Sequence, residues 1–312
     1  MARLAHQGRP DMTFAKHQEL RGEMRHNESL CDHTSWRVGG PAEEMYFPAD
    51  KDDLLCFLRS LPADKSLFWL GLGSNLLVRD GGIKGMVICT KNRLKAMHCN
   101  TDGRVYLEAG VPCAHVARFS SDQGLCGAEF LAGIPGTFGG ALAMNAGAFG
   151  GETWPLVGKV YTVNRLGDVH ERTVEEYQIG YRSVNGPDGE WFLAAELLLK
   201  PGNTLRGREY IKTLLAKRAA TQPVNQPSCG SVFRNPPGDY AARLIESSGL
   251  KGLRIGGACV SEKHANFIVN LGGASANDIE CLIEKVREQV KCCHGISLMP
   301  EVRIVGEPIQ ND

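Results

Sequence analysis

The feature of this 312-residue sequence that most constrains its fold is a glycine-rich stretch without charge. Residues 130–151 contain seven glycines and no Asp, Glu, Lys or Arg. So many glycines make a poor membrane-spanning helix, because glycine is unfavourable in a helix interior. Gly133, Gly136 and Gly139 recur every third residue and expose backbone that can wrap a pyrophosphate or a planar ring. The alternative is tight packing of this backbone against a sheet.

A second glycine segment runs from Gly71 to Asn75, after an apolar run at 67–70 that predicts a strand. Its backbone N–H groups can form an anion-binding nest, and Ser74 and Asn75 add polar side chains. The third glycine of a dinucleotide-binding fingerprint is missing, and strand-like residues follow instead of a helix. No Gly-x-x-x-x-Gly-Lys-Ser/Thr motif occurs. A Rossmann domain and a P-loop nucleotidase are therefore disfavoured, while a tight turn remains the plain alternative.

Composition narrows the class of protein further. Lys and Arg total 35, as do Asp and Glu, so the net charge is zero and the electrostatic footprint of a nucleic-acid-binding protein is missing. Eleven cysteines without a Cys-x-x-Cys pair indicate reduced thiols in a cytoplasmic protein, with no metal site. The first 30 residues lack the apolar core of a signal peptide, and we expect them to form a flexible extension.

Helical and strand patterns mix without strict alternation, which predicts an α+β protein. A Pro- and Gln-rich break at 221–227 leads us to place a domain boundary shortly before it, near Gly202. Ser275 with Asp278 is expected to cap the start of the last helix, and Gly295 its end. We expect helices over 50–59, 113–123, 206–220, 240–247 and 278–293, and strands over 67–70, 86–88, 105–109, 157–163, 169–172, 191–199, 265–270 and 299–305.

Several ordered motifs together resemble one family. They are the two glycine segments, residues 34–42 (TSWRVGGPA), Tyr181-Arg182 with residues 230–236 (GSVFRNP), and residues 300–303 (PEVR). The sequence is similar over about residues 30–307 to the UDP-N-acetylenolpyruvoylglucosamine reductases, the MurB family. Ser231 follows Arg182 by 49 positions, as in the shorter variant of the family that lacks an inserted substrate loop.

The resemblance implies the fold and the reaction. An FAD-binding fold of the vanillyl-alcohol-oxidase (PCMH) type would occupy two subdomains at 31–92 and 93–202, and a C-terminal α+β substrate-binding domain would occupy 203–312. With non-covalent FAD and NADPH as hydride donor, the protein would reduce UDP-N-acetylglucosamine enolpyruvate to UDP-N-acetylmuramate in peptidoglycan precursor synthesis. The partner is then a small-molecule UDP sugar, and we expect a cytoplasmic monomer that neither binds nucleic acid nor inserts into a membrane.

The resemblance also implies site residues. Arg182 and Glu301 would stabilise charge on the substrate carboxylate, Ser231 would donate a proton, and Arg234 and Asn235 would bind substrate. An ionised Glu301 would repel a developing enediolate, so we expect it to have a raised pKa or to act through a neighbour. The implied cofactor-binding residues are Gly71, Gly73, Ser74, Asn75, Leu76, Gly133, Ile134, Pro135, Gly136, Gly139, Gly140, Asn145, Gly147 and Arg182.

Each of these residues has a structural alternative. Ser231 can be an ordinary turn serine, Asn235 can cap its Asn-Pro-Pro-Gly turn, and Glu301 can pair with Arg303 or Arg254. Two other functions also fit the glycine segments: an oxidase of the same FAD fold that acts on an alcohol or aldose, and a non-catalytic protein that binds flavin or a nucleotide sugar. The joint presence of Arg182, Ser231 and Glu301 favours the reductase.

Overall fold

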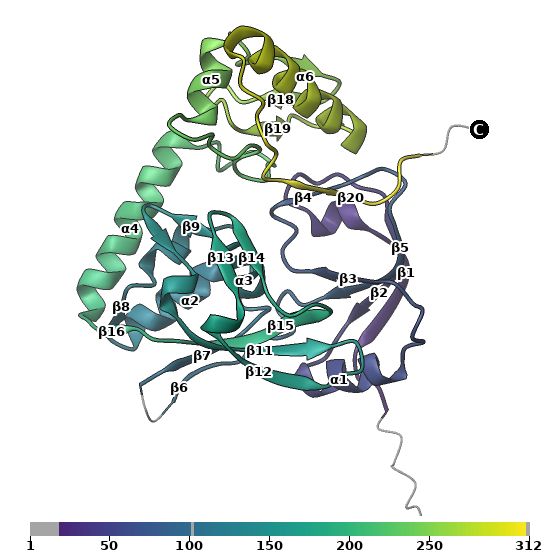
Figure 1. Cartoon of the computed structure of the whole chain (residues 1–312), viewed down its shortest axis with the longest axis vertical. Coiled ribbons are helices and arrows are strands. Elements are labelled where there is room, and N and C mark those ends of the chain that lie inside the picture. The colour runs from purple at the N-terminus through teal and green to yellow at the C-terminus, as the bar shows by residue number, and fades with distance from the viewer. Residues whose placement is uncertain (1–18, 101–102, 310–312) are drawn as a thin grey trace, which may run out of the picture.

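The computed structural model describes residues 19–100 and 103–309. Two β-sheets lie next to each other in the lower part of Figure 1, and the C-terminal region sits above them. The long helix α4 (Thr204–Thr221) runs along one edge and connects the sheets to this upper region. The mixed helix and strand content confirms the α+β class.

The first sheet has the strand order β1-β2-β5-β3. β2 (Pro41–Phe47), β3 (Leu67–Leu70) and β5 (Ile83–Cys89) run parallel, and β1 (Glu23–Ser29) pairs antiparallel with β2. The strand β1 corrects our expectation of a flexible extension up to residue 30, because it makes a seven-residue edge strand. The rest of that expectation, over residues 1–18, lies outside the described residues. α1 (Lys51–Ser60) follows β2, and the Asp50 side chain caps it by accepting from the Asp53 N–H.

The second sheet is antiparallel and has the order β12-β11-β15-β7-β6. Trp69 of the first sheet stacks on Trp191 of the second, with ring centroids 5.2 Å apart, so the sheets share a core. The chain passes from one sheet to the other between residues 89 and 97, which supports the proposed subdomain boundary at 92/93. The strands are β6 (Met97–Cys99), β7 (Val105–Glu108), β11 (Val157–Asn164), β12 (Val169–Thr173) and β15 (Glu190–Leu197).

Two helices and several short elements complete this half. α2 (Cys113–Asp122) was expected, whereas the seven-residue α3 (Phe138–Met144) inside the glycine-rich stretch was not. The Thr137 side chain caps the start of α3, and Asn145 ends it in the left-handed conformation. The remaining short elements are η1 (Leu30–His33), β4 (Leu76–Val78), β8 (Leu125–Cys126), η2 (Glu129–Gly133), β9 (Gly147–Ala148), β10 (Gly151–Glu152), η3 (Trp154–Leu156), η4 (Val174–Glu176), β13 (Gln178–Gly180), β14 (Ser183–Asn185) and β16 (Lys200–Pro201).

The C-terminal domain packs α6 (Ala276–His294) on a small antiparallel sheet. The predicted ends of α6 are confirmed: Ser275 and Asp278 form a capping box, and Gly295 ends the helix at φ 70°. The apolar face of α6 is fully buried at Ile279, Leu282 and Ile283. The other elements are α5 (Ala241–Ser247), β17 (Arg254–Ile255), β18 (Ala258–Val260) and β19 (Ile268–Asn270).

Helix α4 belongs to the second subdomain by its packing. Its buried Ile211 joins the core beneath α2 and η2, and its Gly207 lies against Ser121 of α2. Our expected domain start at residue 203 is therefore too early by one helix. The sequence of α4 does not show which domain the helix packs on, because few apolar positions mark its buried face.

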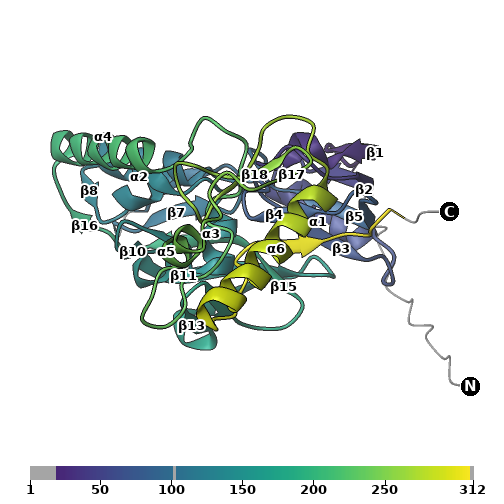
Figure 2. The same cartoon turned by 90° about the horizontal axis from the view of Figure 1, so that it is seen from above.

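The C-terminal domain is tied to the first subdomain by two features. β20 (Arg303–Val305) returns from the domain and pairs parallel with β4, and Figure 2 shows α6 beside this pair. Trp36 is fully buried in the core of the C-terminal domain, where its Nε1 donates to the Ile268 carbonyl at 2.7 Å. Trp36 thus connects segments more than 200 positions apart in the sequence. Together with the β4–β20 pairing, it holds the C-terminal domain against the first subdomain.

Candidate active site

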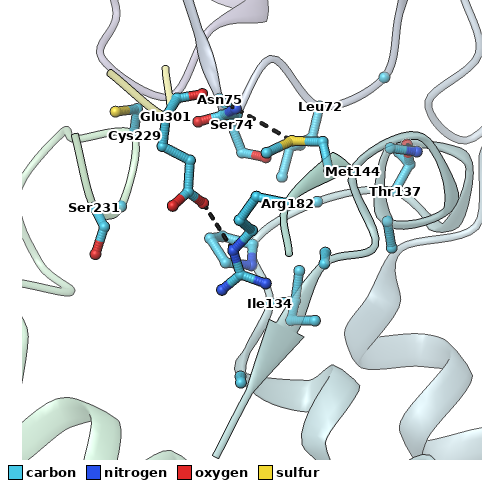
Figure 3. A pocket seen from close by; sticks show the side chains of 18 of the residues that line it. Leu72, Ser74, Asn75, Ile134, Thr137, Met144, Arg182, Cys229, Ser231 and Glu301 are labelled. Carbon is cyan, nitrogen blue, oxygen red and sulfur yellow. Dashed lines mark hydrogen bonds and ion pairs between the residues drawn. The ribbon is translucent and has the colours of Figure 1, made fainter. Parts of the chain in front are cut away.

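A cavity of about 390 Å³ opens where the two subdomains and the C-terminal domain meet. Both glycine segments line it, together with Arg182, Ser231 and Glu301. Figure 3 shows these three side chains around one space, with Asn75 and Ile134 nearby. The structure therefore brings together residues from five separate sequence motifs. The predicted cofactor residues that line the cavity are Gly71, Gly73, Ser74, Asn75, Leu76, Gly133, Ile134, Pro135, Gly136, Gly140, Gly147 and Arg182.

The two glycine segments approach each other closely. A Cβ on Gly71 would collide with the Thr137 hydroxyl, and one on Gly136 would lie 3.3 Å from Ser74 Oγ. Gly73 has φ +68°, a conformation that favours glycine. The cavity wall is therefore largely bare backbone with small side chains, which fits a flat ring system and a diphosphate. These residues would hold FAD.

Two predicted cofactor residues have structural roles instead. Gly139 does not line the cavity, because it faces Ala109, and a Cβ there would lie 2.7 Å from the Ala109 Cβ. The Asn145 side chain is buried and fully engaged: it donates to Glu152 Oε2 and the Gly180 carbonyl, and it accepts from the Trp154 N–H. Both residues shape the wall from behind, and a direct contact of either one with the cofactor stays a prediction.

Arg182 occupies the turn between β13 and β14, with φ +53°. This left-handed conformation is uncommon for a non-glycine residue and is typical of functional sites. Its Nη2 donates to the Gly147 carbonyl at 2.9 Å, and its Nε lies 3.0 Å from Glu301 Oε1. The hairpin thus presents the guanidinium to the cavity between the glycine-rich stretch and the C-terminal domain.

Backbone pairing holds Ser231 beside Glu301. The Glu301 N–H donates to the Val232 carbonyl at 2.7 Å, and the Arg234 N–H donates to the Met299 carbonyl at 2.9 Å. Gly230 precedes Ser231 at φ +81°, and the chain bends at Gly230. The Ser231 hydroxyl lines the cavity. Main-chain geometry therefore fixes the segments that carry the Ser231 hydroxyl and the Glu301 carboxyl next to each other.

The Glu301 carboxyl is buried within the cavity wall. Burial raises its pKa, which the positive charges of Arg182 and Arg234 partly counteract. The side chains of Arg182 and Glu301 are 18% and 13% exposed, so solvent screens their pairing little. The pKa of Glu301 is thus raised, in the direction that we expected. Its ion-pair partner is Arg182 instead of Arg303 or Arg254.

The two predicted substrate-binding residues lie behind the residues that line the cavity. The Arg234 Nη2 donates to the Arg182 carbonyl at 3.2 Å, while its buried Nε has no hydrogen-bond partner among the described residues. Asn235 Oδ1 accepts from the Ala241 N–H and so caps α5. This is the structural role that the Asn-Pro-Pro-Gly turn allowed, and a substrate contact by either residue stays a prediction.

Sequence reasoning missed several residues that line the cavity. Thr137 precedes two glycines and carries the signal of a helix cap, which our reading of the glycine stretch passed over. Trp69, Met144, Phe149 and Phe267 had no distinguishing signal. The missed polar residues are Arg218, Gln222, Cys229 and Arg303.

The fold and the site define an FAD-binding protein with a separate C-terminal domain. The FAD binding domain family matches residues 43–173, and the C-terminal domain family of UDP-N-acetylenolpyruvoylglucosamine reductase matches residues 222–305. None of the helices in the described ranges has the length and apolar character needed to cross a membrane.

Whole-chain relatives identify the family. The UDP-N-acetylenolpyruvoylglucosamine reductase of Methylococcus capsulatus is 66% identical, over 92% of this chain and 94% of that protein. The protein of the same name from Nitrosococcus oceani is 58% identical, over 93% and 97%. The crystal structure of the Thermus caldophilus enzyme matches with a TM-score of 0.78 and 33% identity, over 91% of this chain and 98% of that one. The chain belongs to the UDP-N-acetylenolpyruvoylglucosamine reductase family, in its short form without an inserted loop.

Proposed function

We propose that this protein reduces UDP-N-acetylglucosamine enolpyruvate to UDP-N-acetylmuramate in peptidoglycan precursor synthesis, with non-covalent FAD and NADPH. The overall change is that NADPH, a proton and the enolpyruvyl ether give NADP⁺ and the lactyl ether. The observation that carries the proposal is the meeting of Arg182, Ser231 and Glu301 in a cavity walled by both glycine segments. Membership of the reductase family supports it.

Bound flavin supplies the hydride chemistry, which no side chain of the cavity can provide. The residues of the chain then handle charge and a proton. Hydride addition to the vinyl carbon remote from the carboxylate moves charge onto that carboxylate, and the Arg182 guanidinium is suited to stabilise it. In its protonated form, which burial favours, Glu301 can donate a hydrogen bond to the same oxygens.

The second bond to hydrogen forms at the carbon next to the carboxylate. We assign this proton to the Ser231 hydroxyl, which backbone pairing places beside Glu301. A serine is a weak acid, so its role depends on the positive charge of Arg182 and Arg234 nearby. We further propose a cytoplasmic monomer without nucleic-acid or membrane partners. All three groups come from a single chain, and the zero net charge gives no electrostatic footprint for nucleic acid.

The test is an assay of the purified yellow holoprotein. We expect NADPH consumption only when the enolpyruvyl UDP sugar is present, with UDP-N-acetylmuramate as product. Peroxide formation from an alcohol or aldose would instead indicate an oxidase. A flavin that is neither reduced nor reoxidised under either condition would indicate a binding protein.

A further inference from the structure

One buried thiol at the cavity has no part in the mechanism proposed above. Cys229 lines the cavity two positions before Ser231, and the residue is only 5% exposed. It belongs to the apolar core of the C-terminal domain, in the same cluster as the buried Val232 and Val302. Cys229 is therefore a position at which this core reaches the cavity.

Backbone contacts on both sides of Cys229 hold it near Glu301. The preceding residue, Ser228, pairs with Val269 of β19, and the Val232 carbonyl accepts from the Glu301 N–H at 2.7 Å. Figure 3 shows the Cys229 thiol and the Glu301 side chain on the same side of the cavity. The thiol is thus a fixed part of the wall next to the glutamate.

The thiol of Cys229 is a neutral group and not a nucleophile. Burial, together with the negative charge of Glu301, holds the pKa of this thiol well above its ordinary value. It therefore keeps its proton throughout the neutral pH range, and a protonated thiol is unreactive. Within the described ranges it forms no hydrogen bond to the side chain of another residue. A buried thiol of this kind behaves as a small apolar group.

The charged groups around the Glu301 carboxyl favour its ionised form. Arg182, from the turn between β13 and β14, makes the one ion pair of Glu301 among the described residues. The positive charge of Arg234 acts from the segment that follows Ser231. The glycine segments line the cavity without a charged side chain. The other cationic residues that line the cavity are Arg218 of α4 and Arg303 of β20.

With arginines beside it, a carboxyl keeps its proton only where the rest of its surroundings are dry. Serine at position 229 would have nearly the shape of cysteine, but its hydroxyl would hydrogen-bond strongly to a carboxylate or hold a water molecule there. Alanine would keep the wall apolar and leave a small gap. The choice of a thiol thus combines the volume of serine with a surface that attracts little water.

We propose that Cys229 is a positioning residue for the reduction: its buried, neutral thiol completes a dry wall beside Glu301 and so keeps the carboxyl in its protonated form. Glu301 then remains a hydrogen-bond donor toward the substrate carboxylate. This inference rests on the proposed function, because the reaction at that carboxylate is what uses the proton.

The experiment measures flavin reoxidation by the enolpyruvyl substrate across pH, in NADPH-reduced holoenzyme. Cys229→Ser adds a hydroxyl at nearly constant volume, and Cys229→Ala removes volume without adding polarity. Cys229→Thr and Cys229→Val form a second pair that differs chiefly in the hydroxyl, in case the serine variant does not fold. Cys259→Ser is the matched control, because Cys259 is also buried in the C-terminal domain but does not line the cavity. FAD content and the thermal midpoint are measured for every variant.

For Cys229→Ser we expect the pH at which the rate has fallen by half to drop by about half a unit to one unit, because the carboxylate is better solvated. The rate at low pH should stay near that of the parent. Cys229→Ala should keep the midpoint of the parent and lose thermal stability. Cys229→Thr should follow the serine variant, Cys229→Val should follow the alanine variant, and Cys259→Ser should keep the midpoint of the parent.

An unchanged midpoint in Cys229→Ser and Cys229→Thr would overturn the proposal. An equal shift in the apolar variants would also overturn it, since it would show that Cys229 acts only through its volume. Urea unfolding of each variant with and without Glu301→Gln, at several pH values, follows the titration of Glu301 without turnover. If the parent is inactive but this titration moves to lower pH in Cys229→Ser, the proposed reaction is wrong and the role of the thiol stands. Normal turnover without such a movement would refute the role of the thiol alone.

Discussion

Arg182 Nε lies 3.0 Å from Glu301 Oε1, although the two residues are 119 positions apart and belong to different domains. A turn with a left-handed residue presents the arginine, and the irregular segment that leads into β20 presents the glutamate. The pair closes one wall of the cavity. Burial raises the pKa of Glu301, and the positive charges of Arg182 and Arg234 lower it.

If Glu301 acts as proposed, the rate of flavin reoxidation by the enolpyruvyl substrate should depend on pH. Because burial raises its pKa above 4.5, the carboxyl keeps its proton over a wider pH range, and the rate should fall as pH rises through the raised value. Glu301→Gln keeps a hydrogen-bond donor and should be slower but flat over that interval. Stopped-flow measurements across pH test this, and an equal decline in both proteins would contradict it.

The same shift predicts a stability effect. A carboxyl with a raised folded-state pKa contributes most to stability below pH 4.5, and that contribution is lost as pH rises through the folded-state value. Glu301→Gln should therefore gain stability relative to the parent as pH rises. Urea unfolding at several pH values checks the sign of this difference.

Asn75 links the first glycine segment to the backbone of Glu301. Its Nδ2 donates to the Glu301 carbonyl at 3.0 Å, and its own carbonyl accepts from the Arg303 N–H at 3.0 Å. Asn75→Ala should lower the single-turnover rate about tenfold through misplacement of Glu301, and should change the pH profile. The Ser74→Ala variant is the control, because Ser74 lines the same cavity without this contact. If saturating FAD restores the rate of Asn75→Ala to that of the parent, Asn75 is a cofactor contact and not a positioning residue.

Gly136 and Gly139 should respond differently to alanine. A Cβ at Gly139 would lie 2.7 Å from Ala109 Cβ behind the wall, so Gly139→Ala should destabilise the protein by about 1–3 kcal/mol. A Cβ at Gly136 would enter the cavity, so Gly136→Ala should weaken FAD binding with a smaller change in stability. Thermal unfolding and flavin fluorescence titration separate the two effects. A reversal of this pattern would show that Gly139 touches the cofactor.

Trp36 should behave as a structural anchor. Trp36→Phe keeps most of the apolar volume but leaves the buried Ile268 carbonyl without its donor, which should cost about 1–3 kcal/mol of unfolding free energy. Denaturant unfolding of the variant measures this. A stability equal to that of the parent would show that the hydrogen bond contributes nothing to holding the C-terminal domain.

Local patterns predicted the elements that local chemistry decides. The capping box at Ser275 and the end at Gly295 define α6, and the apolar run at 67–70 defines β3, because both signals lie within a few residues. The edge strand β1 was missed, since its polar sequence becomes a strand only by pairing with β2. The packing of α4 on α2 was missed for a similar reason, because nothing near it in sequence specifies the partner.

For the site too, some residues could be found from the sequence and others only from the fold. The glycine segments and Arg182, Ser231 and Glu301 could be found because their motifs recur in a known family. The sequence does not distinguish Gly139 and Asn145 from the neighbouring residues that line the cavity. Only the fold shows that they face Ala109 and Trp154. Arg218 has no motif, and only the fold shows that it lines the cavity.

The most direct test of the central claim is a single turnover of Ser231→Ala beside the parent in heavy water. NADPH-reduced enzyme is mixed with the enolpyruvyl substrate, and flavin reoxidation and deuterium at C2 of the product's lactyl group are followed. We predict that the parent reoxidises and incorporates deuterium, while the variant retains FAD and is slower by a factor of 10² or more, as expected for loss of a general acid. A variant that turns over like the parent would show that Ser231 is a turn residue, and a parent that does not reoxidise would contradict the assigned reaction.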